Sequence, residues 1–220
     1  MARRGSRPAG PVLVQLRFAS GLTSDEYVTR EAWREASLER CPLHPDGGCG
    51  LARHGTYRRV SPEGTRIARW YCRLGHCTFS LLPDCLAARF PGALADIEQV
   101  VATVERAASI EAAANLLRPD PVTLASAVRW VMRRVRLARI ALQSWITLWP
   151  EHLQGCAPSV HELRARLGCA QILVAGRALA AELLHALPRF VGFAPPAWRS
   201  SGRKKPDQQH MGADPPASAP

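Results

Sequence analysis

Apolar and polar residues alternate along several short segments in the first third of the chain, and a period of two is typical of β-strands. Residues 12–18 (VLVQLRF) follow this pattern and predict a short strand. Residues 51–60 and 65–72 share it and are joined by the turn-forming sequence SPEG, so together they predict a β-hairpin. Residues 78–83 (TFSLLP) predict a closing strand that ends at its proline.

Apolar residues recur at spacings of three and four after residue 92, which predicts helices. One helix is expected over residues 93–107, and a second, capped by Ser109, continues to residue 117. A long helix is predicted from about residue 123 to residue 149, where Pro150 ends it.

Capping sequences mark further helices. The capping box TSDE starts a helix expected over residues 24–39, and the capping box SVHE starts one that extends to residue 167, with Gly168 as its stop. The last helix is predicted over residues 170–187. This apolar run contains an arginine, a glutamate and a histidine, so it predicts a core helix of a soluble protein and not a membrane span.

Cysteine and histidine residues gather in two groups at the ends of the predicted hairpin. The first group reads CPLH and then CG, from Cys41 to Gly50, and the second reads CRLGHC, from Cys72 to Cys77. Tetrahedral Zn²⁺ takes four sulfur or nitrogen donors, and two short-spaced groups on turns at one end of a hairpin bring such donors together. The pattern therefore predicts a zinc ribbon with a structural zinc ion.

The residue types leave the ligand set open. Cys41 with His44 has the spacing of one ligand pair, while Cys49 is an equally good first-group ligand because the following glycine frees backbone amides. Cys72 is the clearest ligand of the second group, and its partner is either His76 or Cys77. We expect four ligands among six candidates: Cys41, His44, Cys49, Cys72, His76 and Cys77.

Other roles for these cysteines are possible. They could be free thiols of a small domain, or they could form disulfides. Disulfides are disfavoured because the chain has seven cysteines, an odd number, and no secretory signal precedes them. The same absence favours a cytoplasmic protein.

The charge of the chain constrains its partner. The formal net charge is +11, which points to an anionic polymer or surface. Arginines are dense on the predicted hairpin, where Tyr57, Trp70 and Tyr71 lie between them, a combination that suits phosphate contact and base stacking. The alternative is a solvated hairpin face. The expected contacts on the hairpin are Arg58, Arg59, Arg66 and Arg69.

The long helix has a similar bias. Residues 121–150 contain five arginines and no acidic residue. A short helix, a connection and a longer basic helix form the outline of a helix-turn-helix, although the connection here is longer than usual. An amphipathic core helix with a solvated arginine face is the alternative. The expected DNA contacts on this helix are Arg129, Arg133, Arg134 and Arg136.

The hairpin region resembles a known kind of module. The sequences HGTYRR, RWYC and TFSLLP, after a Cys-Pro pair that follows an amphipathic helix, are similar to the zinc ribbon at the start of bacterial insertion-sequence transposases. More closely, they resemble a bacterial family of unknown function built on that ribbon. The resemblance covers roughly residues 40–92 and implies DNA binding in a mobile-element context. It carries over no catalytic residue.

Catalysis is not expected. Metal-assisted phosphoryl transfer needs carboxylates that converge on one site, whereas the acidic residues after Gly92 fall on separate predicted helices and loops. No phosphate-binding glycine loop or metalloprotease motif is present. In a transposition system, catalysis would come from a separate transposase or recombinase chain.

The sequence thus predicts an α+β protein: a zinc-ribbon hairpin followed by a helical, helix-turn-helix-like bundle. The expected divisions are an N-terminal strand and helix (1–40), the ribbon (41–92), the helical domain (93–194) and a disordered basic tail (195–220). The expected function is zinc-dependent binding of double-stranded DNA, without a membrane or an enzymatic role. A protein-interaction scaffold and an RNA-binding protein are the alternatives.

Overall fold

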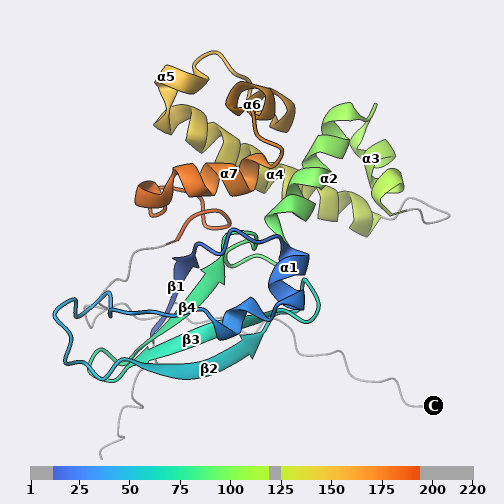
Figure 1. The fold of residues 1–220 in the computed structure, drawn as a ribbon. Coiled ribbons are helices and arrows are strands. Elements are labelled where there is room, and N and C mark those ends of the chain that lie inside the picture. Colours follow the sequence, from blue (N-terminus) through green and yellow to red (C-terminus); the bar gives the residue numbers. More distant parts are fainter. Residues whose placement is uncertain (1–11, 119–124, 194–220) are drawn as a thin grey trace, which may run out of the picture.

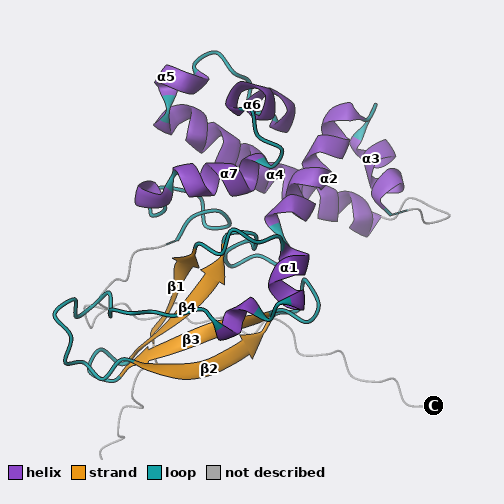
Figure 2. Ribbon diagram, in the orientation of Figure 1, coloured by secondary structure: helices purple, strands orange, loops and turns teal. Residues whose placement is uncertain are grey.

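A computed structural model describes residues 12–118 and 125–193 as a four-stranded sheet with the helices that follow it gathered at one end (Figures 1 and 2). The α+β class is therefore confirmed. Predictions about residues 1–11, 119–124 and the tail lie outside the described residues. The elements are β1 (Val12–Phe18), α1 (Ser24–Thr29), η1 (Ala32–Arg34), β2 (Ala52–Arg58), β3 (Arg66–Cys72), β4 (Cys77–Pro83), α2 (Leu94–Arg106), α3 (Ile110–Leu117), α4 (Ala125–Leu148), α5 (Pro150–Leu153), α6 (Val160–Leu167), α7 (Ile172–Leu179) and η2 (Ala181–Leu183).

The sheet has the strand order β1-β4-β3-β2. The predicted hairpin is confirmed as the antiparallel pair β2–β3, and the predicted closing strand is β4, which pairs antiparallel with β3. Strand β1 pairs parallel with β4, so that Val14 lies opposite Phe79 and Leu16 opposite Leu81. The sheet therefore includes the N-terminal strand and extends across the boundary expected at residue 40.

One face of the sheet packs against α1 and η1, and here the predicted helix over residues 24–39 is wrong. Its capping box forms, because the Thr23 hydroxyl accepts from the Glu26 amide and the Glu26 carboxylate accepts from the Thr23 amide. The helix nevertheless ends at Thr29, and Glu31 takes a left-handed conformation with φ of 48° before the 3-10 turn η1.

Aromatic packing explains the break. Tyr27 and Trp33 are six residues apart and would point about 120° away from each other on a continuous helix. In the structure both are buried and meet edge to face, with ring centroids 5.8 Å apart. The Tyr27 hydroxyl also donates to the carbonyl of Arg66 on β3. The break therefore lets both aromatic side chains cover the sheet.

The helical part has its own core, in which α2 contacts α3, α4, α6 and α7. The helices predicted over residues 93–107 and 109–117 are confirmed as α2 and α3, and the long helix is α4. Gly176 of α7 lies so close to the Trp145 ring that an added Cβ would be 2.6 Å from it. Within the described residues, no helix has both the length and the apolar composition needed to cross a membrane.

The last predicted helix is too long. Instead of residues 170–187, α7 covers only Ile172–Leu179 and is followed by the short turn η2. The chain then folds back, because the Phe193 amide donates to the Leu184 carbonyl, and Phe190 and Val191 enter the core. Burial of these apolar side chains opposes continuation of the helix.

Two glutamates of α2 cap the helices that pack on it. The fully buried Glu98 carboxylate accepts from the Ile172 and Leu173 amides, each at 2.8 Å, and from Arg164 Nε at 2.6 Å. Seven residues later, the Glu105 carboxylate accepts from the first two amides of α6. These contacts satisfy amides that a helix leaves without internal partners.

We expect Glu98→Gln to lower the free energy of unfolding by about 3 kcal/mol, because the substitution removes the buried charge that α7 and Arg164 contact. Denaturant unfolding followed by circular dichroism measures the loss. Glu111→Gln, at an exposed acidic position in the first turn of α3, is the matched control and should cost less than about 1 kcal/mol. Equal losses in the two variants would contradict the capping role of Glu98.

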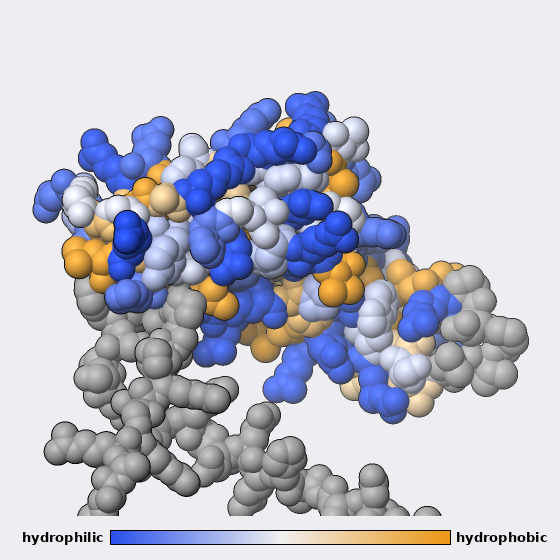
Figure 3. Space-filling view, turned by 90° about the horizontal axis from the view of Figure 1, so that it is seen from below, coloured by the Kyte–Doolittle hydropathy of each residue, from blue (hydrophilic) through white to orange (hydrophobic). Residues whose placement is uncertain are grey.

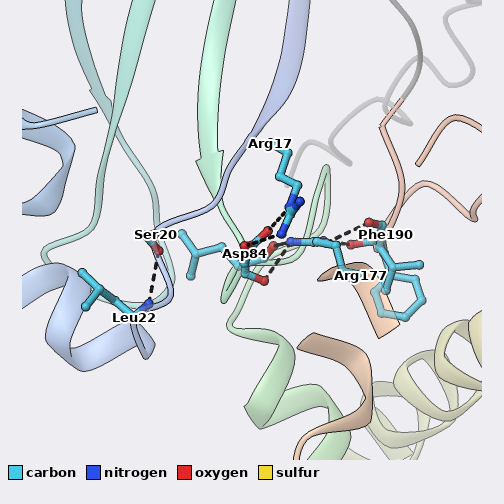
Figure 4. Close-up of polar contacts among 8 residues, drawn as sticks. Arg17, Ser20, Leu22, Asp84, Arg177 and Phe190 are labelled. Atoms are coloured by element: carbon cyan, nitrogen blue, oxygen red, sulfur yellow. Dashed lines mark hydrogen bonds and ion pairs between the residues drawn. The ribbon is translucent and has the colours of Figure 1, made fainter. Parts of the chain in front are cut away.

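Arg177 of α7 connects the helical part to the sheet (Figure 4). Its side chain is fully buried and its guanidinium donates to four backbone carbonyls, those of Asp84 and Leu86 after β4 and of Phe190 and Val191 near the C-terminal end. Burial lowers the pKa of Arg177 to about 10, so the group stays charged at neutral pH. The Asp84 carboxylate in turn accepts two hydrogen bonds from Arg17 of β1, at 2.7 and 3.1 Å.

Candidate metal centre and basic surfaces

Four of the six predicted ligand candidates come together at one end of the sheet. The donor atoms of Cys41, His44, Cys49 and Cys72 all lie within 4.8 Å of one another. The three cysteines are buried and His44 is half-buried. Among the described residues this is the one group of histidine, cysteine and acidic side chains with such spacing, and it could hold a metal ion.

Three of the donors come from the loop that precedes β2. The His44 amide donates to the Cys41 carbonyl at 3.1 Å, which closes a tight turn and brings His44 Nδ1 to 3.5 Å from Cys41 Sγ. Cys49 follows two glycines in left-handed conformations, which a side chain would disfavour. The Leu74 amide donates to the Cys49 carbonyl and joins this loop to the turn between β3 and β4.

The fourth donor is at the end of β3. Cys72 Sγ lies 3.4 Å from His44 Nδ1 and accepts a hydrogen bond from the Gly75 amide at 3.2 Å. Burial, together with the neighbouring thiols of Cys41 and Cys49, raises the pKa of the Cys72 thiol to about 11, against the lowering effect of the Gly75 amide. A bound cation would reverse this effect, because it stabilises thiolates.

The turn after Cys72 depends on glycine at position 75. A Cβ atom there would be 2.9 Å from Leu43 Cδ1, 3.3 Å from Cys72 Sγ and 3.4 Å from His44 Cε1. A larger residue would therefore displace two of the four donor side chains.

We expect Gly75→Ala to weaken metal binding by about tenfold, because small displacements of ligand-supporting groups cost affinity on that scale. Competition with a chromogenic chelator measures the affinity. Leu74→Ala alters an exposed side chain in the same turn and should leave the affinity unchanged. An unchanged affinity in Gly75→Ala would show that the contacts around Gly75 do not position the ligands.

The other two candidates lie outside the cluster. His76 has φ of 45° and its Nδ1 lies 3.2 Å from the Tyr71 hydroxyl. Cys77 begins β4, opposite Cys72 in the β3–β4 pair, and is buried beside the cluster. Three donors thus come from the loop before β2 and one from the end of β3, whereas the sequence spacing predicted two short pairs.

The four donors make a closed set. Three thiols and one imidazole match the number and type of ligands in structural metal sites, which leave no position for water or substrate. The cluster packs on Val14 and Phe79 of the sheet, in a small core of its own. A metal ion here would join the long loop before β2 to the strands.

The predicted arginine contacts on the hairpin differ in their surroundings. Arg58 is exposed and lies directly opposite Arg66, which is half-exposed. Arg69 is half-buried on the other face. Arg59 has an internal role instead, because its guanidinium donates to the Ala87 and Phe90 carbonyls at 3.0 and 2.6 Å.

The arginines of α4 also include exposed residues and one that packs against the rest of the fold. Arg129, Arg133 and Arg136 are exposed on one side of the helix, while Val131, Val135 and other apolar side chains face the core. Arg134 packs over the Trp130 ring, 3.8 Å from its centroid, and over Phe90, and burial lowers its pKa. Arg134, like Arg59, is therefore half-buried and in contact with other parts of the fold.

Three residues that are prominent in the structure were not predicted from the sequence. Arg177 connects the two parts of the molecule, and Gln15 and Arg89 line a hollow beside Arg69. The glutamine within the otherwise β-forming sequence VLVQLRF was the available signal for the hollow. Arg89 and Arg177 had no sequence signal, because their roles depend on contacts distant in the chain.

Comparison with known proteins finds no match to this chain among family models, curated proteins or solved structures. The resemblance to transposase zinc ribbons thus remains an expectation from the sequence.

Proposed function

We propose that the chain is a double-stranded DNA-binding protein whose sheet is held together by a structural zinc ion. Zinc is the metal that best fits three cysteine sulfurs and one histidine nitrogen in a closed site. The proposal assigns no catalytic role to the ion, because all four positions would be filled by protein ligands. A separate transposase or recombinase chain is a compatible partner.

The observation that carries DNA binding is the exposed side of α4. This helix of 24 residues contains no acidic side chain, and its arginines at positions 129, 133 and 136 share one face. None of these three forms an ion pair with a described residue. Guanidinium groups that are free of protein carboxylates are available for phosphate oxygens, and release of counterions then favours binding.

The hairpin supports the same function. Arg58 and Arg66 are a directly opposed pair of like charges, which is unfavourable in an isolated sheet and is relieved when a phosphate lies between them. Hydrophilic side chains cover most of the face shown in Figure 3, with apolar side chains in smaller groups between them.

We expect Arg133→Gln/Arg136→Gln to weaken binding of a duplex and to reduce the salt dependence by about two phosphate contacts, since each contact contributes about one to the slope. Fluorescence anisotropy between about 50 mM and about 200 mM salt measures both quantities.

The matched control removes the same charge elsewhere. Arg30→Gln/Arg34→Gln eliminates two exposed arginines whose guanidiniums pair with Glu26 and Glu31. This variant should bind nearly as the unmodified protein does. Equal weakening in both variants would show that the effect depends on net charge alone. Binding that does not change with salt concentration would favour a protein-interaction scaffold. Stronger binding of single-stranded RNA than of duplex DNA would favour the RNA alternative.

A further inference from the structure

The face of the sheet that α1 does not cover carries a polar row across three strands. Gln15 of β1 lies opposite Ser80 of β4, and Ser80 lies opposite Arg69 of β3. Neighbouring strands are about 4.8 Å apart, and residues in register on adjacent strands point to the same side. A small serine thus separates two long polar side chains, which leaves space above it.

That space is a hollow of about 380 Å³, lined by Leu13, Gln15, Tyr57, Arg69, Ser80 and Arg89. A second hollow of about 270 Å³ shares Gln15, Tyr57 and Arg89 with it and extends toward Arg58 and Phe90. The two together match the size of pockets that bind small molecules, and are larger than a single inorganic anion needs.

Two residues that line the first hollow each have a polar atom without a hydrogen-bond partner. Gln15 Oε1 and Arg69 Nε are both buried from solvent and unsatisfied. Leaving a buried donor or acceptor unpaired is costly, so each such atom in a folded protein needs an explanation. Both side chains are long and flexible, so a rotation would bring these buried atoms to a ligand in the hollow, which would then supply the missing partners.

The charge around the hollows has one sign. Arg69 and Arg89 line the first, Arg58 lines the second, and no described residue lining either is acidic. Arg89 is exposed and has φ of 54°, a left-handed conformation that is uncommon outside glycine. Residues held in such conformations cluster at binding sites, where the surrounding structure maintains them.

We propose that this hollow binds a phosphate monoester, with the phosphate between Arg69 and Arg89 and the rest of the molecule against Tyr57. The guanidiniums donate to the phosphate oxygens. The Gln15 carboxamide, which has both a donor and an acceptor end, contacts a protonated phosphate oxygen or the attached group. A free nucleotide and the terminal phosphate of a nucleic acid strand both present this chemistry. The site is on the sheet and does not rest on DNA binding by α4.

Nuclear magnetic resonance of arginine Nε–H groups in the full chain tests the proposal directly. Inorganic phosphate and adenosine 5′-monophosphate should each shift the Arg69 Nε signal to saturation, with tighter binding for the nucleotide. Sodium chloride at equal ionic strength and adenosine without phosphate should not. Shifts that follow ionic strength alone, without saturation, would overturn the proposal.

Variants locate the site. Arg89→Gln changes an exposed side chain and should weaken phosphate and nucleotide binding at least tenfold, as should Arg69→Gln. Arg133→Gln/Arg136→Gln on α4 should leave both unchanged. Equal loss in the α4 variant would refute a site in this hollow.

Two further probes distinguish the sources of the phosphate. Displacement of the nucleotide by a 5′-phosphorylated oligonucleotide, but not by its unphosphorylated form, would support the site and assign it to strand ends. Binding of the mononucleotide alone would support it as a small-molecule site. The affinity of Arg89→Gln for duplex DNA then tests DNA binding by α4 separately, because this variant leaves the arginines of α4 unchanged.

Discussion

Replacement of Cys72 by serine is expected to remove the metal and to unfold the sheet. Cys72 is the one donor that comes from the strands, and it lies within 4.8 Å of the three donors of the preceding loop. Structural zinc contributes on the order of 10 kcal/mol of apparent binding free energy, which is comparable with the whole stability of a domain. Metal analysis and circular dichroism of the purified variant measure the two effects.

The helices should survive this substitution in part. The core of the helical region contains none of the four donors, so loss of the metal acts first on the sheet and the loops. Cys77→Ser is the matched control, because Cys77 is buried next to the cluster but outside it, and this variant should keep one metal per chain. Loss of metal from Cys77→Ser with retention in Cys72→Ser would reverse the assignment of ligands.

Replacement of Arg177 by methionine is expected to be the most destabilising change outside the metal centre. The guanidinium donates to four buried backbone carbonyls. Of these four, only the Phe190 carbonyl also accepts from another described group, the Ala88 amide. An unpaired buried carbonyl costs about 1–3 kcal/mol, so the free energy of unfolding should fall by about 4 kcal/mol or more. Thermal unfolding should move down by on the order of 10 °C.

Arg166→Met is the control for Arg177. Arg166 is exposed on α6 and donates to one carbonyl, that of His152. It should cost less than about 1 kcal/mol. Equal unfolding temperatures for the two variants would show that Arg177 does not hold the sheet to the helices.

The strands and helices that follow a regular apolar period could be predicted from the sequence, because the period itself reports which face is buried. Hairpin β2–β3 and helices α2, α3 and α4 belong to this class. The ends of α1 and α7 could not, because they are set by partners distant in the chain. Tyr27 and Trp33 meet on the sheet, and the segment around Phe190 folds back onto α7.

The candidate metal centre could likewise be predicted only in part. Cysteine and histidine content identifies the two segments, and spacing along the chain cannot distinguish His44 and Cys49 from His76 and Cys77. That choice depends on the turns, above all the close approach at Gly75 that directs Cys72 toward the first loop. The surroundings of the arginines could not be predicted from the sequence either. Arg133 and Arg134 are adjacent, yet Arg133 is exposed and Arg134 packs over an aromatic ring.

X-ray absorption at the zinc edge, on protein purified without added metal, tests the central claim most directly. The account predicts one zinc per chain bound by three sulfurs at about 2.3 Å and one imidazole nitrogen at about 2.0–2.1 Å. Protein without zinc, or zinc bound by four sulfurs with Cys77 in place of His44, would contradict it.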